Sequence, residues 1–160
     1  MIKIGIGYDL HRLEKGRRFI LGGVEIPFHK GEIGHSDGDV LAHAICDALL
    51  GASALGDIGE LFPSVKLKWK DANSMKLLAD VFMRVKQAGY KINNIDCVVV
   101  CESPKILPYR EEIRKAIADV LELPCGSVFI KGKTSEKLGP IGKGKAVEAF
   151  AQCLLESNDI

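Results

Sequence analysis

The sequence predicts an α/β fold of the α+β kind, a sandwich in which α-helices cover one mixed β-sheet. Three observations lead to this fold class. Short strand-like segments are interspersed with segments whose apolar residues recur at helical spacing. The composition, 47% hydrophobic and 27% charged, is that of an ordinary globular protein. With 160 residues, the chain is long enough for a single domain over residues 1–160, without repeats or linkers.

The amino-terminal residues predict strands. Residues 2–11 alternate well enough to form a first strand, and residues 18–27 predict a hairpin. The hairpin is expected to turn at Gly22 and Gly23, because tight hairpin turns need positive backbone angles that glycine adopts readily. The chain is therefore expected to begin with three strands.

A helix is predicted next, from about residue 36 to Gly51. Ser36 followed three residues later by Asp39 forms a capping box, and apolar residues then repeat at helical spacing. Asp39, His43 and Asp47 are spaced four residues apart, so they share one polar face of this helix. That face is either solvated, or it holds a metal ligand, His43, whose imidazole is oriented by the two carboxylates. The pattern alone leaves both interpretations open.

The middle of the chain predicts a loop, a helix and a buried strand. Residues 55–71 lack periodicity and contain glycine and proline, which is typical of a loop. Residues 72–88 have a helical apolar face that ends before Gly89. The unbroken apolar run within residues 95–101 predicts a strand that is buried on both faces.

The last part of the chain predicts a helix, a strand and a final helix. The first of these helices is expected to follow Pro104 or Pro108 and to end before Pro124. Residues 128–131 predict a short strand, and residues 146–155 predict a final helix. The complete predicted order is β-β-β-α-α-β-α-β-α.

The charge balance argues against whole classes of partner. Lys+Arg 22 and Asp+Glu 21 give a formal net charge of +1, which provides no general attraction for nucleic acid or for an anionic membrane. The first residues lack an apolar signal segment, and no apolar run approaches the roughly 18 residues of a membrane span. We therefore expect a cytoplasmic protein without a nucleic-acid or membrane partner. Its five cysteines form no C-x-x-C pair and are expected to be buried free thiols.

Asp9-x-His11 together with His43 predicts a three-ligand metal site. Residues two apart in a strand point to the same face, so Asp9 and His11 can converge on one ion. One carboxylate and two imidazoles suit zinc or a similar first-row ion. Three protein ligands leave a fourth position open for substrate or water, as a catalytic site requires.

Residues 132–134, Gly-Lys-Thr, follow a predicted strand and end like a phosphate-binding P-loop, but the spacing excludes that motif. A P-loop needs a glycine where this chain has Ser127, and a helix should begin at once. The lysines and hydroxyls of residues 131–143 could still bind phosphate oxygens, and Glu136 offers a hard oxygen ligand suited to magnesium or manganese. A basic surface loop is the alternative interpretation.

A series of ordered motifs spans nearly the whole chain. They are Asp9-x-His11, ILGGV-x-IP at 20–27, HSDGDV at 35–40, DALLGA at 47–52, GDIG-x-LFP at 56–63, PK at 104–105 and TSEKLG at 134–139. Together they resemble the 2-C-methyl-D-erythritol 2,4-cyclodiphosphate synthases of the non-mevalonate isoprenoid pathway. The resemblance implies a phosphorus-oxygen lyase that converts 4-diphosphocytidyl-2-C-methyl-D-erythritol 2-phosphate to the cyclic diphosphate and CMP, by attack of the 2-phosphate on the β-phosphorus. It also implies a homotrimer with active sites between subunits.

The resemblance further implies roles for individual residues. Asp9, His11 and His43 match the zinc ligands, and Glu136 matches the ligand of a magnesium or manganese ion that bridges the diphosphate. The residues that match stabilisers of the transition state are His35 and Thr134. The pocket for the methylerythritol phosphate is matched by His35, Ser36, Asp57, Ile58, Gly59, Phe62 and Pro63. The pocket for the cytidine diphosphate, contributed by an adjacent subunit, is matched by Cys101, Glu102, Ser103, Pro104, Lys105, Ile106, Leu107, Lys133 and Thr134. The expected substrate contacts are completed by Asp9, Leu10, His11, Ser64, Ser135, Glu136 and Lys143.

The chain departs from the family pattern at several positions. Ser64-Val65-Lys66 stands where the family usually has Asp-Thr-Asp, so carboxylate contacts to the substrate hydroxyls are lost or supplied elsewhere. Lys133 replaces a common threonine and adds charge beside the phosphates. Pro140 and Lys143 replace a usual Phe and Arg near the trimer axis, where some relatives bind an isoprenoid diphosphate. Lysine lacks the bidentate fork of arginine, which argues against a ligand at the axis.

Two other functions compete with this interpretation. A non-catalytic trimeric module that binds isoprenoid diphosphates would keep the trimer without needing both metals, and the intact metal ligands argue against it. A metal-dependent phosphoesterase would use water as its nucleophile and would give linear products.

Overall fold

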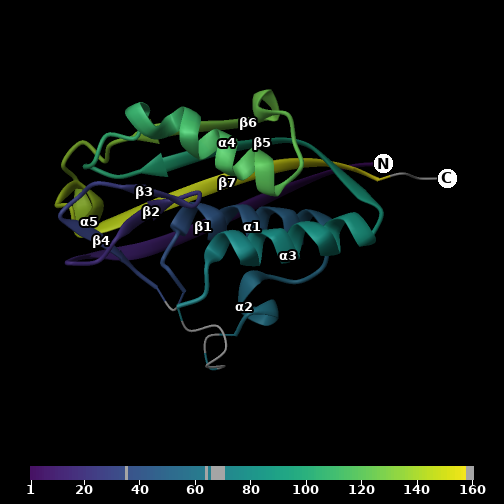
Figure 1. The fold of residues 1–160 in the computed structure, drawn as a ribbon, viewed down its shortest axis with the longest axis horizontal. Helices are drawn as coiled ribbons and strands as arrows, with labels where there is room; N and C mark the ends of the chain where they lie inside the picture. Colours follow the sequence, from purple (N-terminus) through teal and green to yellow (C-terminus); the bar gives the residue numbers. More distant parts are fainter. Residues whose placement is uncertain (35, 64, 66–70, 158–160) are drawn as a thin grey trace.

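A five-stranded mixed β-sheet forms the centre of the computed structural model, which describes residues 1–34, 36–63, 65 and 71–157 (Figure 1). The strands lie in the order β4-β1-β7-β5-β6. Their bounds are Ile2–Lys15 (β1), Lys30–Ile33 (β4), Tyr90–Val100 (β5), Val128–Lys133 (β6) and Ala146–Ser157 (β7). Neighbouring strands are antiparallel except β5 and β6, which are parallel. The predicted fold class, a mixed sheet combined with helices, is confirmed.

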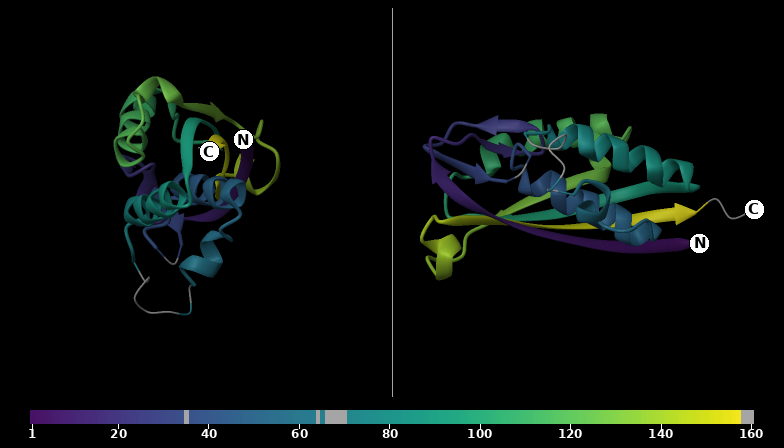
Figure 2. Two further views of the ribbon diagram at one scale, coloured as in Figure 1. Left: turned by 90° about the vertical axis from the view of Figure 1, so that its right-hand side faces the viewer. Right: turned by 90° about the horizontal axis from the view of Figure 1, so that it is seen from below.

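The long helices lie on one face of this sheet (Figure 2). They are α1 (Val40–Ser53), α3 (Ser74–Gln87) and α4 (Arg110–Val120). The shorter helical elements are α2 (Ile58–Leu61), α5 (Gly139–Gly142), η2 (Leu107–Tyr109) and η3 (Cys125–Ser127). Within the described ranges, no helix has both the length and the apolar character needed to cross a membrane.

The predicted hairpin is confirmed as a separate two-stranded ribbon, made of β2 (Phe19–Leu21) and β3 (Val24–Ile26). Gly22 and Gly23 form its turn with φ angles of 55° and 78°, in the left-handed region that favours glycine. A Cβ atom on Gly22 would lie only 2.7 Å from the side chain of Ile113 on α4. The turn therefore packs directly against the helical layer.

Helix α1 lies unusually close to strand β1. A Cβ atom on Gly5 would lie 1.9 Å from the carbonyl oxygen of Ala48, and one on Gly7 would lie 1.8 Å from that of Ala44. No real side chain fits into such gaps, so only glycine allows this approach. Residues two apart share a strand face, so the next positions on the same face are Asp9 and His11. The close packing thus brings these two side chains beside the first turns of α1.

The predicted final helix over residues 146–155 is wrong, because these residues form the central strand β7. The alternate residues Val147, Ala149, Ala151, Cys153 and Leu155 are buried, which is the period-two pattern of a strand. Alanine has a high helix propensity, but the pairing of β7 with β1 and β5 decides the conformation.

Several smaller expectations are also corrected. Strand β5 is not buried on both faces, because buried Ile95, Cys97 and Val99 alternate with partly exposed residues. Helix α1 is capped by Asp39 rather than by Ser36, and it continues past Gly51. The predicted loop over residues 55–71 contains α2. One of the five cysteines, Cys125, is exposed, whereas the other four are buried free thiols as expected.

The approach of α1 to β1 predicts a strong effect of Gly7→Ala. The added methyl group collides with the backbone of α1, so the helix must shift outward. We expect the free energy of unfolding to fall by about 1–3 kcal/mol or more, the usual cost of overpacking a core. Urea unfolding followed by circular dichroism measures this change.

The matched control is Gly51→Ala, which lies in α1 itself. A Cβ atom there meets nothing within 4 Å. Alanine should stabilise the exposed helix position by up to about 1 kcal/mol. Equal unfolding free energies for Gly7→Ala and wild type would contradict the packing argument.

Candidate functional site

Three side chains from β1 and α1 converge to form a candidate metal site. The Oδ2 atom of Asp9 lies 3.0 Å from Nε2 of His11 and 3.0 Å from Nδ1 of His43. All three ligand atoms lie within 4.8 Å of one another, so one ion can contact them together. The predicted metal triad is therefore brought together by the fold.

In each imidazole, the ring nitrogen that points away from Asp9 makes hydrogen bonds to other groups. His11 Nδ1 lies 2.6 Å from the carbonyl oxygen of Gly38, so this nitrogen carries the proton and donates it. His43 Nε2 lies 2.9 Å from the hydroxyl of Ser36 and 2.9 Å from that of Ser74. Each ring therefore presents its other nitrogen to Asp9. One carboxylate oxygen and two ring nitrogens, which give up any proton when a metal binds, fit a first-row divalent ion.

Asp9 and His11 stabilise each other's charged forms. Burial alone would raise the pKa of the Asp9 carboxyl, but hydrogen bonds and charges from His11 and His43 hold that pKa well below its usual range. Burial acts to lower the pKa of His11, but the hydrogen bond to Asp9 and its charge outweigh burial and raise this pKa. A metal ion held by Asp9, His11 and His43 would take the place of the proton shared by Asp9 and His11.

The other two carboxylates on the predicted polar face of α1 hold backbone groups instead of the imidazole. Asp39 is fully buried and accepts hydrogen bonds from the backbone N–H groups of Gly22 at 2.9 Å, Gly23 at 2.7 Å and Ala42 at 3.0 Å. Asp47 accepts from the backbone N–H of Ile58 at 2.8 Å and so positions the start of α2. The outer nitrogen of His43 contacts two serine hydroxyls instead. Ser36 was expected in the substrate pocket, and Ser74 was not singled out from the sequence.

Glu32 of β4 is a buried acid at the start of α1. Its Oε2 atom accepts from the backbone N–H of Val40 at 3.3 Å, while Oε1 has no hydrogen-bond partner among the described residues. Burial raises the pKa of Glu32 well above its ordinary value, and the nearby negative charge of Asp39 adds to the effect. The folded protein therefore favours a protonated carboxyl at this position.

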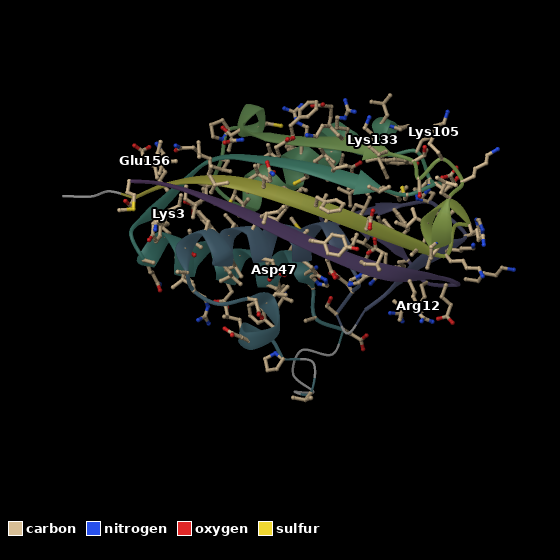
Figure 3. The ribbon with its side chains drawn as sticks, turned by 180° about the vertical axis from the view of Figure 1, so that it is seen from behind. Lys3, Arg12, Asp47, Lys105, Lys133 and Glu156 are labelled. Atoms are coloured by element: carbon tan, nitrogen blue, oxygen red, sulfur yellow. The ribbon has the colours of Figure 1, made fainter. Side chains whose placement is uncertain are left out.

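A hollow of about 240 Å³ lies at the β6 edge of the sheet, with β7 and β5 between it and the triad. Its lining contains eight residues of the predicted cytidine diphosphate pocket, namely Cys101, Glu102, Pro104, Lys105, Ile106, Leu107, Lys133 and Thr134. Figure 3 shows the side chains of Lys105 and Lys133 close to this edge. Arg110 also lines the hollow, although the sequence argument did not single it out. Its guanidinium group stacks on Phe129 with 5.1 Å to the ring centroid, and it has no hydrogen bond or ion pair within the described part of the chain.

The segment after β6 folds back on itself beside this hollow. Thr134 donates its hydroxyl proton to Oε1 of Glu136 at 2.6 Å. Glu136 and Lys137 adopt left-handed backbone angles, with φ of 50° and 61°. A Cβ atom on Gly142 would lie 2.1 Å from the backbone of Lys137, so only glycine lets α5 close against this turn. The exposed carboxylate of Glu136 is thus held at a fixed place near Thr134.

The metal triad and the hollow are far apart within one chain. Leu10 pairs with Glu148, Glu148 with Val100, and Val100 with Lys133, so these residues lie in one row across the sheet. Three strand spacings separate Leu10 from Lys133, a distance of about 14 Å. Strands β7 and β5, with the core that covers them, fill the space between. A single chain therefore does not join the two halves of the predicted site.

Several other predicted site residues lie elsewhere or outside the description. Asp57 caps α2 through the backbone N–H of Glu60 at 2.8 Å, with Ile58 and Gly59 in that short helix. Ser103, Ser135 and Lys143 do not line the hollow. His35 and Ser64 lie outside the described residues.

Comparison with known proteins places this geometry in a family. Residues 2–156 match the YgbB family. The chain belongs to this family. A curated Treponema denticola protein, named 2-C-methyl-D-erythritol 2,4-cyclodiphosphate synthase, is 60% identical over 154 residues, which cover 96% of each chain.

Solved structures of similar proteins share the fold. The bifunctional IspDF from Campylobacter jejuni superposes with a TM-score of 0.96 at 40% identity, covering 99% of this chain and 43% of that one. The Plasmodium falciparum IspF–CDP complex superposes with a TM-score of 0.87 at 39% identity, covering 99% of this chain and 97% of that one. At 40% and 39% identity, these proteins are similar to this chain in sequence as well as in fold.

The buried acid at the start of α1 predicts a pH-dependent effect of Glu32→Gln. In the unfolded wild-type chain, Glu32 loses its proton above the ordinary glutamate pKa of about 4.3. In the folded protein its raised pKa lets Glu32 keep that proton to higher pH. Wild-type stability should therefore fall as pH rises from there toward the folded pKa. Glutamine does not titrate, so the variant should gain about 2–4 °C in Tm at pH ~8, the shift that 1 kcal/mol produces in a protein of this size.

Thermal unfolding of both proteins between pH ~5 and ~8 tests this expectation. The advantage of Glu32→Gln should shrink toward the acidic end. The exposed change Glu14→Gln, on the adjacent strand β1, serves as the control and should alter Tm little at any pH. A Tm difference between Glu32→Gln and wild type that is the same at all pH values would contradict the argument.

Proposed function

We propose that this protein converts 4-diphosphocytidyl-2-C-methyl-D-erythritol 2-phosphate to 2-C-methyl-D-erythritol 2,4-cyclodiphosphate and CMP. The observation that carries the proposal is the convergence of Asp9, His11 and His43 on one point, in a chain whose curated relatives are named as this synthase. The intact triad also argues against a non-catalytic binding module. The protein would act as a phosphorus-oxygen lyase in isoprenoid precursor biosynthesis, in the cytoplasm.

The proposed chemistry needs no nucleophilic side chain. The substrate carries its own nucleophile, the 2-phosphate, and its own leaving group, CMP. The protein must hold the 2-phosphate in line with the β-phosphorus and neutralise the charge of the transferring group. A bond forms between a 2-phosphate oxygen and the β-phosphorus, while the bond from that phosphorus to the oxygen of CMP breaks.

Ions at two metal sites would together neutralise the negative charge of the diphosphate. Zinc at Asp9, His11 and His43 and a magnesium or manganese ion at Glu136 would act as Lewis acids on the diphosphate when bound. The mixed carboxylate and imidazole set suits zinc, whereas a single carboxylate suits a hard ion that keeps most of its water ligands. His35 and Thr134 would stabilise the transition state, and the hydrogen bond from Thr134 fixes the carboxylate beside it.

The hollow at the β6 edge would hold the cytidine diphosphate part of the substrate. The Plasmodium falciparum relative was solved as a complex with CDP, which supports a nucleotide pocket in this fold. Lys105, Lys133 and Arg110 line the hollow with positive charge that suits a diphosphate. On the triad side, the methylerythritol phosphate would be held by Ser36, Asp57, Gly59 and Phe62 with their neighbours.

A homotrimer would complete the site by placing the hollow of one subunit beside the triad of the next. The sheet face without long helices, seen in Figure 3, supports assembly. Its large exposed apolar residues on β1 and β7 are Ile2, Ile4, Ile6, Tyr8, Leu10 and Phe150. Ile4 and Ile6 are 74% and 65% exposed in the single chain. A contiguous apolar surface of this kind marks an interface with another protein chain.

Replacing an apolar residue of this face tests the assembly. We expect Ile6→Asp to dissociate the trimer, because an interface cannot bury an unpaired carboxylate without a large penalty. The chain should still fold, since Ile6 is exposed in the single chain. Light scattering should report the mass of one chain instead of three, and turnover should fall with it.

The control for this experiment is Met83→Lys on α3. Met83 is 45% exposed, but it lies in the helical layer on the other side of the sheet. It should leave both the mass and the turnover unchanged. A fully active Ile6→Asp monomer would refute the shared site.

The reaction itself is tested by mass spectrometry of the product. Wild type with zinc and magnesium should release CMP and a cyclic diphosphate, and His43→Ala should lose bound zinc and give no product above background. Linear hydrolysis products would indicate a phosphoesterase. Unchanged substrate with wild type would indicate a binding module.

A further inference from the structure

The turn that carries Glu136 has a backbone conformation that its residues do not favour. The backbone N–H of Leu138 closes the turn by donating to the carbonyl oxygen of Ser135 at 2.8 Å. Its two central residues, Glu136 and Lys137, have φ angles of 50° and 61°. Positive φ at both central positions is typical of a type I′ turn, which asparagine and glycine favour. Glutamate and lysine adopt such angles only at a cost, so other contacts must hold the turn.

Most of the contacts that hold this turn are local. The hydroxyl of Ser135 donates to the carbonyl oxygen of Leu138 at 2.8 Å. The backbone N–H of Glu136 donates to the hydroxyl oxygen of Thr134 at 3.4 Å. Burial of side chains contributes little, because Glu136 and Lys137 are exposed and Leu138 is 70% exposed. The hydrophobic core therefore does not fix the conformation of the turn.

Glu102 provides a contact from a distant part of the chain. Its Oε2 atom accepts a hydrogen bond from the backbone N–H of Lys137 at 3.4 Å, across 35 residues of chain. Among the residues that the structure describes, no other hydrogen bond reaches residues 135–138 from outside residues 134–142. Glu102 follows β5 and the turn follows β6, so this bond joins the segments beyond two neighbouring parallel strands.

The charge of Glu102 does not suit a contact with a nucleotide diphosphate. Lys105, Lys133 and Arg110 line the same hollow with positive charge, whereas a carboxylate repels a diphosphate. Within the described part of the chain, Glu102 makes no ion pair with these cations, and its polar partner is the N–H of Lys137. A structural task explains the presence of this carboxylate better than a substrate contact does.

We propose that Glu102 is a positioning residue, which holds the turn closed through Lys137 and thereby fixes the Glu136 carboxylate beside Thr134. This inference rests on the proposed role of Glu136 as the ligand of a magnesium or manganese ion. It gives Glu102 a task other than the nucleotide contact that the family resemblance implies. Without this bond, the turn can relax toward negative φ angles, and the carboxylate of Glu136 then leaves its place.

This task requires an oxygen atom at residue 102 but not a negative charge. The side-chain amide of glutamine offers an oxygen that can accept from a backbone N–H, whereas alanine offers none. A residue that bound the cation directly would depend on its charge, because hard cations prefer carboxylate ligands. Comparison of Glu102→Gln with Glu102→Ala therefore separates positioning from direct metal binding.

The first measurement follows the turn itself and needs no turnover. Solvent exchange of the Lys137 amide proton is measured by NMR on 15N-labelled protein without added magnesium. Loss of the acceptor should speed up this exchange severalfold in Glu102→Ala, because the amide becomes free to open to water. The exchange rate of Glu102→Gln should lie close to that of wild type.

The second measurement follows the metal requirement of the reaction. The magnesium concentration that gives half-maximal turnover should rise about 10- to 100-fold in Glu102→Ala, the usual loss when a residue that orients a metal ligand is removed. The KM for the substrate should change much less, because the cations that line the hollow remain. Glu102→Gln should recover most of the lost magnesium affinity.

The matched control is Glu111→Ala on α4. The carboxylate of Glu111 is also exposed and also accepts a hydrogen bond, from Nη1 of Arg114 at 2.8 Å, but it makes no contact with the turn. The control should change neither the exchange of the Lys137 amide nor the magnesium requirement. It separates the loss of the clamp from the general effect of removing an exposed carboxylate.

The possible failures can be told apart. If Glu102→Ala keeps the wild-type exchange rate and magnesium requirement, the proposal is wrong. It is also wrong if Glu102→Gln is as defective as Glu102→Ala, since the negative charge of Glu102 would then act directly on the cation. A wild-type enzyme whose turnover does not depend on magnesium or manganese would instead overturn the metal role of Glu136.

Discussion

The contact between helix α1 and strand β1 determines the geometry of the candidate site. Gly5 and Gly7 leave room for the carbonyl oxygens of Ala48 and Ala44, so the helix axis approaches the strand more closely than any side chain would allow. The strand continues from Gly7 to Asp9 on the same face, and the helix presents His43 directly beside Ala44. Two rigid elements in backbone contact therefore set the separation of the ligands. Such a scaffold holds them more accurately than loops would.

Hydrogen bonds to the β2–β3 hairpin and to α3 hold the start of α1 in place against β1. Asp39 ties the turn of the β2–β3 hairpin to the first turn of α1 through three backbone N–H groups. Asp37 ties the same end of α1 to the start of α3. Both carboxylates belong to the Ser-Asp-Gly-Asp run that precedes the helix. That run therefore serves mainly to join three elements at the end of α1 that carries His43.

Local spacing explains how much of this arrangement the sequence could predict. The pairing of Asp9 with His11 follows from the two-residue period of a strand, and the hairpin follows from Gly22-Gly23. The fold class and the metal triad were therefore predictable. Strand β7 was not, because its alanines suit a helix and only pairing with distant strands makes it a strand. Ser74 was missed because it meets Asp37 across 37 residues of chain, a separation that no short motif encodes.

The separation of the triad and the hollow by the width of the sheet has a genetic consequence. In the proposed trimer, each site takes its metal ligands from one subunit and its nucleotide pocket from the next. A defect in the triad and a defect in the pocket then damage different halves of the site. Two inactive alleles of this kind, expressed in one cell, would complement each other, because a mixed trimer contains a site built from two undamaged halves. Alleles that both alter the triad would not.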